Sequence, residues 1–217
     1  MSFIEKIWNY EPRSCLKCGS FAVNESLFCN YCFAELYQPG ESLYFRNDPV
    51  ETYYLFNWIP MESDSLSFLL RQLKGSQQII AWRSYAKLFW KEIYVHNILQ
   101  FEGKDVLLVP SPSKYPGQPD HAEIFCKNLS EFSGFPMASI LQRKDVSEQK
   151  KKRKKDRQNN RLKLIENFSA NIISGKHVIF VDDILTTGGT ALAAQRALGV
   201  VKNFTVWTLA SRAFGCE

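Results

Sequence analysis

The sequence predicts an α/β fold: a twisted, mainly parallel sheet flanked by helices, with a small cysteine-rich module in front of it. Two observations support this prediction. Strand-like apolar segments, typical of buried parallel strands, occur at 104–109 and 178–181 and alternate with segments of helical periodicity. Two Cys-x-x-Cys pairs precede them, within residues 15–32. The length of 217 residues suits one domain with an appendage.

The composition excludes several classes of protein. Hydrophobic residues make up 45% of the chain and aromatic residues 14%, as in a globular protein with a filled core. The chain contains no run of 18 apolar residues, which a transmembrane helix would need. Residues 1–10 lack the apolar stretch of a signal peptide. We therefore expect a cytoplasmic protein, in which clustered cysteines bind metal rather than form disulfides.

The cysteine pairs have the spacing of a metal site. Ten residues separate Cys15 and Cys18 from Cys29 and Cys32. Four thiolates complete a tetrahedral zinc shell and leave no open coordination position, so we expect a structural Zn²⁺ in a module spanning residues 1–42. A redox role for either pair is the alternative, and it needs a thioredoxin-like context.

The middle of the chain supplies a hairpin and three helices. Two short strands, 43–46 and 53–56, flank a turn at 47–49 and form a hairpin, which we take as a linker over residues 43–60. The main domain then spans 61–217. Helices are predicted over 63–71, over 81–98 and from a capping-box-like start at 119–123.

Within the main domain, we expect four strands at 104–109, 136–141, 178–181 and 203–209. The last alternates in polarity, which favours an edge or near-edge position. On the helix that starts at 119–123, Cys126 is expected to be a small buried hydrophobe. His121, in its first turn, is interpreted as a surface residue rather than a catalytic one.

The stretch 178–190 predicts an anion-binding turn. A four-residue apolar strand is followed by Asp182 and Asp183, then by Thr-Thr-Gly-Gly-Thr, and then by an Ala-rich helix over 191–198. The two glycines permit positive φ, and successive N–H groups at a helix N-terminus bind phosphate. Paired carboxylates suit the hydroxyls of a sugar diol beside it. The alternative is an ordinary strand-to-helix junction capped by threonine.

Two other segments suit anions. The loop after strand 104–109 contains Ser111, Pro112, Ser113 and Lys114, at the carboxyl end of a strand where open α/β sheets bind ligands. Residues 143–163 hold eleven Lys and Arg and three acids, a local +8 in a chain of net +5, so the remainder carries −3. Such a segment is a solvated arm, a loop that closes over an anionic ligand, or a contact for the nucleic-acid backbone.

Residues 178–190 closely resemble the phosphoribosyl-pyrophosphate (PRPP) motif of type I phosphoribosyltransferases. The resemblance implies that Asp182 and Asp183 hold the ribose hydroxyls and that the Thr-Gly loop holds the 5′-phosphate. That loop comprises Thr186, Thr187, Gly188, Gly189 and Thr190. It also implies the phosphoribosyltransferase fold, Mg²⁺ bound with PRPP, and a pyrophosphate loop after the first sheet strand, which matches 111–114.

The whole chain is similar to the ComF family of competence proteins. The shared features, in order, are the four-Cys finger, Leu73-Lys74-Gly75, the Val-Pro-Ser-Pro loop, Arg143…Gln149…Arg157…Asn160, and the PRPP motif. Membership implies a cytoplasmic role in natural transformation, as single-stranded DNA enters the cell. It also implies partners, namely a DNA-translocating helicase and other competence proteins, and through them a peripheral place at the inner membrane. The basic segment would contact DNA or pyrophosphate through Lys151, Lys152, Arg153, Lys154, Lys155, Arg157 and Arg161.

One stretch departs from that family. Residues 115–121 read Tyr-Pro-Gly-Gln-Pro-Asp-His, where the family carries a basic Arg-Gly-Phe-Asn-Gln stretch. The contact that this stretch makes in the family, to an acceptor or the diphosphate, therefore does not carry over to residues 115–121, and no catalytic residue is identified. Two other functions stay open: a phosphoribosyltransferase acting on a nucleobase-like acceptor without a DNA role, and a zinc scaffold that has lost its ligand. The finger argues against the first and the intact motif against the second.

Overall fold

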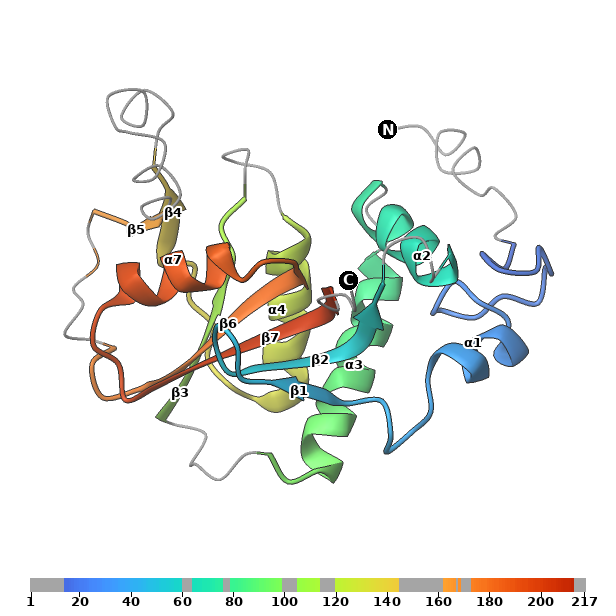
Figure 1. The fold of residues 1–217 in the computed structure, drawn as a ribbon, viewed down its shortest axis with the longest axis horizontal. Coiled ribbons are helices and arrows are strands. Elements are labelled where there is room, and N and C mark those ends of the chain that lie inside the picture. The colour runs from blue at the N-terminus through green and yellow to red at the C-terminus, as the bar shows by residue number, and fades with distance from the viewer. Residues whose placement is uncertain are drawn as a thin grey trace, which may run out of the picture.

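A five-stranded sheet organises the protein (Figure 1). The computed structural model describes residues 14–59, 64–75, 79–98, 105–113, 120–144, 162–166, 168 and 173–212. The strand order is β1-β2-β7-β6-β3, with β1 antiparallel to β2 and the other neighbours parallel. The strands are β1 (Tyr44–Arg46), β2 (Thr52–Trp58), β3 (Val106–Pro110), β6 (His177–Leu185) and β7 (Asn203–Arg212). The predicted α/β class with a mostly parallel sheet is confirmed.

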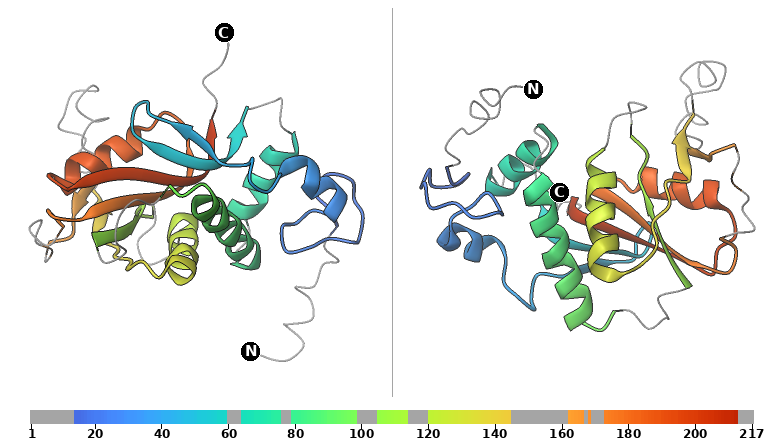
Figure 2. Two further views of the ribbon diagram at one scale, coloured as in Figure 1. Left: turned by 90° about the horizontal axis from the view of Figure 1, so that it is seen from below. Right: turned by 180° about the vertical axis from the view of Figure 1, so that it is seen from behind.

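Helices cover both faces of the sheet, and each face has its own core (Figure 2). On one face lie α2 (Asp64–Gly75), α3 (Ile79–Val95) and α4 (His121–Ser133), and on the other lies α7 (Gly189–Leu198). Alternate residues of β6 therefore enter different cores: Ile179 and Val181 pack toward α3 and α4, while Val178 and Phe180 pack toward α7. This two-sided burial explains why the strand segment is apolar without alternation.

The predicted helices form, but their ends differ from the prediction. The segment predicted at 63–71 is α2 and extends to Gly75, and the segment predicted at 81–98 is α3 and ends at Val95. Asp120 caps α4 by accepting a hydrogen bond from the backbone N–H of His121 at 2.7 Å, and Gly134 ends that helix with φ 73°. Cys126 is fully buried on α4, as expected.

The cysteine module packs directly on the main domain. Its helix, α1 (Asn30–Leu36), begins at the second cysteine pair, where no helix was predicted. Phe28 of this module is fully buried in the same core as Leu69, Tyr85 and Ile93 of α2 and α3. The hydroxyl of Tyr85 donates to the carbonyl oxygen of Ser26 at 2.7 Å. Module and sheet domain thus share one hydrophobic core.

The predicted hairpin forms, and it belongs to the main sheet. The two strands pair from Tyr44 opposite Tyr54 to Arg46 opposite Thr52, and β2 then pairs in parallel with β7 over its length. The turn between them ends at Val50, whose carbonyl oxygen accepts a hydrogen bond from the Thr52 hydroxyl at 2.8 Å. The hairpin supplies two of the five strands rather than a connection to them.

Three strand predictions need correction. Residues 136–141 do not form a sheet strand: Met137 makes one isolated bridge to Leu108 beside β3, because Pro136 has no N–H to donate and the N–H of Ile140 turns back to Ala138.

The strand predicted at 203–209 is the middle strand of the sheet. Its polar positions are buried but satisfied: Thr205 shares a 3.0 Å hydrogen bond with His177, and the Thr208 hydroxyl donates to the carbonyl of Ala210.

The third correction concerns the strand that carries the acid pair. β6 runs to Leu185, so Asp182 and Asp183 lie inside its last part, opposite β7, and do not follow its end. Main-chain pairing with Thr208 therefore holds Asp182, and Asp183 lies between it and Ile184, which pairs with Ala210.

A separate antiparallel pair flanks the basic segment. β4 (Leu141–Arg143) pairs with β5 (Leu162–Leu164), with Arg143 opposite Leu162. Leu141 and Leu162 are buried in the α7 core. The two flanks of the segment 145–161 are therefore adjacent, although the segment itself lies outside the described residues. Across the described part of the chain, no helix is both long and apolar enough to span a membrane.

Candidate functional site

The four predicted cysteines form one cluster. The sulfur atoms of Cys15, Cys18, Cys29 and Cys32 all lie within 4.8 Å of one another, and the sulfurs of Cys18 and Cys29 are 3.7 Å apart. Four sulfurs around zinc, each at roughly 2.3 Å, are separated by roughly 3.8 Å in a tetrahedron. The donor set and spacing therefore fit a zinc ion.

Local backbone geometry builds this cluster. At the first pair, the N–H of Gly19 donates to the carbonyl of Cys15 at 2.9 Å, and Gly19 adopts φ 74°, the left-handed conformation that closes the turn. At the second pair, Cys29 is the N-cap of α1, and its sulfur accepts from the N–H of Cys32 at 3.5 Å. The turn at Gly19 and the start of α1 therefore bring the two cysteine pairs together.

The thiols differ in acidity before metal binds. Burial raises the pKa of Cys15, but hydrogen bonds from the backbone of Cys18, Cys29 and Lys17 outweigh it and bring the value to about 6. Burial and the neighbouring thiols raise the pKa of Cys32 to about 12. Zinc binds thiolates, so loading this cluster must release protons.

A pocket of about 580 Å³ lies at the carboxyl ends of the parallel strands. Because β3 and β6 are parallel neighbours, the segments that follow them lie side by side at this edge. The pocket collects the acids of β6, the threonines after it and the serines after β3. Its lining includes Ser111, Ser113, Arg143, Asp182, Asp183, Thr186 and Thr190. Two loops predicted separately from the sequence thus meet in one site.

The acid pair is held in an ordered arrangement. The backbone N–H of Asp183 donates to Oδ1 of Asp182 at 3.0 Å, and the N–H of Ile184 donates to Oδ1 of Asp183 at 2.7 Å. The ammonium group of Lys74, at the end of α2, lies 2.9 Å from Oδ2 of Asp183. Burial, reinforced by the charge of Asp183, raises the pKa of Asp182 to about 8.

The turn after β6 requires glycine at one position. Gly188 has φ 72° and is the N-cap of α7, and a Cβ built on it would lie 2.4 Å from Cγ and 2.9 Å from Cδ of Pro49. Pro49 belongs to the β1–β2 turn, so that turn packs on the Thr-Gly loop. Of the predicted loop, Thr186 and Thr190 line the pocket, whereas Gly188 is buried beneath them.

The loop after β3 is fixed from both sides. The N–H of Ser111 donates to the carbonyl of Val181 at 2.8 Å, which ties this loop to the residue before the acid pair. Nε of Arg143 donates to the carbonyl of Pro112 at 3.0 Å, and Arg143 itself lines the pocket. Lys114 and the seven basic residues from Lys151 to Arg161 lie outside the described residues.

Three pocket residues had no role assigned from the sequence. Lys74 appeared only as part of a shared motif, and nothing in its neighbours indicates an ion pair with a residue 109 positions away. Trp58, at the end of β2, has its ring fixed by a hydrogen bond from Nε1 to the hydroxyl of Ser67 at 3.0 Å. His121, expected at the surface, is only partly exposed and lines the pocket. All three side chains reach the pocket through packing between elements that are far apart in the sequence.

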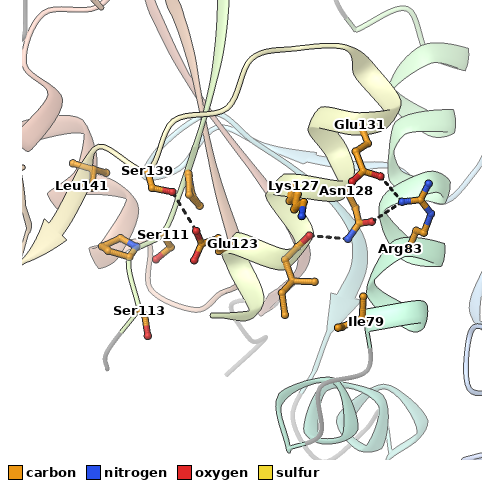
Figure 3. A pocket seen from close by; sticks show the side chains of 13 residues that line it. Ile79, Arg83, Ser111, Ser113, Glu123, Lys127, Asn128, Glu131, Ser139 and Leu141 are labelled. Atoms are coloured by element: carbon orange, nitrogen blue, oxygen red, sulfur yellow. Dashed lines mark hydrogen bonds and ion pairs between the residues drawn. The ribbon is translucent and has the colours of Figure 1, made fainter. Parts of the chain in front are cut away.

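A second pocket, of about 750 Å³, lies over the outer face of α4 and shares Ser111 and Ser113 with the first (Figure 3). One of its cations is paired: Arg83 contacts both Glu131 and Asn128, and the amide of Asn128 donates to the carbonyl of Ile124. Figure 3 shows these partners oriented toward one another. Thr186 and Thr190, at the start of α7, line the first pocket and not this one, so the first pocket is the better candidate for a phosphate.

Comparison of the sequence with protein-family models and with curated proteins found no match.

Proposed function

We propose that this chain is a PRPP-binding protein with the phosphoribosyltransferase fold, of the ComF type, which handles single-stranded DNA in the cytoplasm during natural transformation. The observation that carries the PRPP assignment is that Asp182, Asp183 and the Thr-Gly loop share a pocket with Ser111 and Ser113. A volume of about 580 Å³ is in the ordinary range for small-molecule sites. Helicase and competence-protein partners rest on the family resemblance alone.

The layout matches the three parts of PRPP. Thr186 and Thr190, at the start of α7, would bind the 5′-phosphate together with backbone N–H groups. Asp182 and Asp183 would accept hydrogen bonds from the ribose hydroxyls. The diphosphate would then lie toward the β3 loop, with Arg143 beside it, and Mg²⁺ would supply charge to its oxygens.

Calorimetric titration of PRPP with Mg²⁺ tests this assignment. Each carboxylate hydrogen bond to the ribose is worth about 1.5–3 kcal/mol, so Asp182→Asn combined with Asp183→Asn should weaken binding at least tenfold. Asp105→Asn is a matched control, because Asp105 pairs with Lys202 at the opposite end of β3. Wild-type protein that does not bind PRPP, or a double variant that binds it normally, would contradict the proposal.

Turnover on a nucleobase-like acceptor is the second candidate, and Trp58 favours it. Its ring is fixed in the pocket that holds the acid pair, and a planar acceptor stacks well on such a ring. In that reaction the bond from C1′ to the diphosphate oxygen breaks, the bond from C1′ to the acceptor nitrogen forms, and pyrophosphate leaves. Release of pyrophosphate from PRPP, measured with and without added bases, distinguishes an enzyme from a binding protein.

A further inference from the structure

His121 is held in place by the hydrophobic core. It is the first residue of α4, and its ring stacks on that of Trp82, with centroids 6.0 Å apart and ring planes at 21°. Trp82 is 1% exposed, and its Nε1 donates to the carbonyl of Leu73, next to Lys74 on α2. The same packing therefore positions His121 and the lysine that binds Asp183.

Among the described residues, no hydrogen bond or ion pair to the ring of His121 is found, in contrast to the other two histidines. His177 shares a 3.0 Å hydrogen bond with Thr205, and Nε2 of His96 lies 3.5 Å from Glu92. Nδ1 of His121 is buried, and no partner for it exists among the described residues. A neutral imidazole carries its proton on one nitrogen, and a buried Nδ1 with no acceptor beside it favours the proton on Nε2. Nε2 is the remaining polar atom of this pocket-lining ring.

In the orientation proposed above, the diphosphate end of PRPP would lie near His121. If the 5′-phosphate lies on the turn after β6 and the ribose on Asp182 and Asp183, the rest of PRPP extends toward β3, the next strand. The groups at that side are Ser111, Ser113, Arg143 and the start of α4. The diphosphate is the part of PRPP that lies there.

We propose that His121 donates a hydrogen bond from Nε2 to the diphosphate of PRPP, in a ring orientation set by the stack on Trp82. This inference rests on the proposed function. The neighbouring charges explain why a ring N–H is useful at this place. Asp120, Asp182 and Asp183 line the pocket, and only Lys74 and Arg143 oppose them among its described residues. Asp120 is already engaged as the cap of α4.

The test compares three ligands on four forms of the full chain. The ligands are PRPP, inorganic diphosphate and ribose 5-phosphate, each titrated with Mg²⁺. The proteins are the wild type, His121→Phe, His121→Gln and His96→Phe. His121→Phe keeps an aromatic ring against Trp82 but has no donor, and His121→Gln supplies a donor without the ring. His96→Phe makes the same replacement at a histidine whose partner is Glu92, outside the pocket.

We expect His121→Phe to bind PRPP and diphosphate roughly ten- to a hundredfold more weakly, which is the usual range for a hydrogen bond to a charged group. Ribose 5-phosphate binding should be unchanged, which shows that the pocket is still folded. His121→Gln should recover part of the loss, and His96→Phe should match the wild type. A His121→Phe protein that binds PRPP normally, or that loses ribose 5-phosphate equally, would overturn the role of His121 while leaving PRPP binding intact. Diphosphate binding that depends on His121, in a protein that does not bind PRPP, would instead overturn the proposed function and retain this site.

Discussion

The hydroxyl of Tyr37 donates a 2.5 Å hydrogen bond to the carboxylate of Glu92, 55 residues further along the chain. Glu92 is fully buried on α3, and it also accepts from the backbone N–H of Gly40 at 3.0 and 3.1 Å. Tyr37 is the C-cap of α1, so a buried carboxylate connects the cysteine module to the main domain. Its partners are needed because a buried charge is costly when it loses hydrogen bonds.

Tyr37→Phe should therefore destabilise the whole protein. It removes one hydrogen bond to a buried carboxylate, and a cost of about 1–3 kcal/mol is expected. Urea unfolding of the variant measures this cost. Tyr31→Phe makes the same change at a side chain that is 77% exposed and should leave the free energy of unfolding unchanged. Equal stabilities of the two variants would mean that Glu92 is satisfied without Tyr37.

Removing zinc should lower the melting temperature of the sheet domain as well as unfold the finger. The reason is that Phe28 and three of the cysteines lie in the core shared by α2 and α3. A finger that folded on a separate core would give two thermal transitions after chelation. We expect one transition at lower temperature. Metal analysis before and after chelation, with calorimetry of both samples, checks this, and a purified protein without zinc would contradict the metal assignment.

The charge on Asp182 should lower the free energy of unfolding as the pH rises. The pKa of Asp182 is raised from 3.8 to about 8 in the folded protein, so the folded state binds more protons than the unfolded state between these values. Its unfavourable contribution is absent below pH 4 and grows until about pH 8. Asp182→Asn should thus leave stability unchanged at pH 4 and increase it at pH 8, on the order of a few kcal/mol, since one pKa unit corresponds to about 1.4 kcal/mol.

Thermal melts of wild type and Asp182→Asn at both pH values measure this difference. An asparagine can still accept the backbone hydrogen bond from Asp183, so geometry is preserved. A variant that is equally stabilised at pH 4 and pH 8 would contradict a role for the charge. Stability gained by removing a charged pocket residue is the behaviour expected of a binding site rather than of a structural ion pair.

Gly188→Ala should damage the Thr-Gly loop, whereas Gly189→Ala should not. An alanine at Gly188 would need φ 72° and would place Cβ 2.4 Å from Pro49. At Gly189, the nearest atom to a new Cβ is Oγ1 of Thr187 at 3.5 Å, an ordinary contact. We expect the first variant to lose about 1 kcal/mol or more of stability, together with PRPP affinity, and the second to fold as the wild type does. Chemical unfolding and PRPP titration of both variants provide the measurements.

The sequence predicted those parts of the fold that depend on local pattern. The apolar segment before Asp182, the cysteine spacing and the cap at Asp120 were each visible within one short stretch of sequence. The central position of β7 was not, because its alternation reflects buried threonines whose partners, such as His177, come from another strand. The same limit applies to the site. The Thr-Gly loop is a local pattern, but Lys74, Trp58 and His121 reach the pocket only through tertiary packing.

The last prediction concerns single-stranded DNA and the basic segment. Residues 143–163 carry a local +8 in a chain of net +5, and the flanks of this segment meet where Arg143, a pocket residue, pairs with Leu162. Contacts to phosphates release counterions, so affinity for single strands should fall with salt, with a log–log slope of roughly −0.7 per neutralised phosphate. Replacing Lys151, Lys152, Lys154 and Lys155 with alanine should flatten that slope and weaken all sequences alike.

Fluorescence titration with labelled single strands across a salt series measures the slope. Alanine at Lys87 and Lys91 of α3 is the control, because it removes cations outside the basic segment and should change the slope less. PRPP has the same sign of charge as DNA, and Arg143 joins the pocket to the segment. The two ligands should therefore weaken each other's binding, and the effect must be reciprocal. DNA binding that is absent at low salt, or that the four-lysine variant retains in full, would show that the segment is a solvated arm.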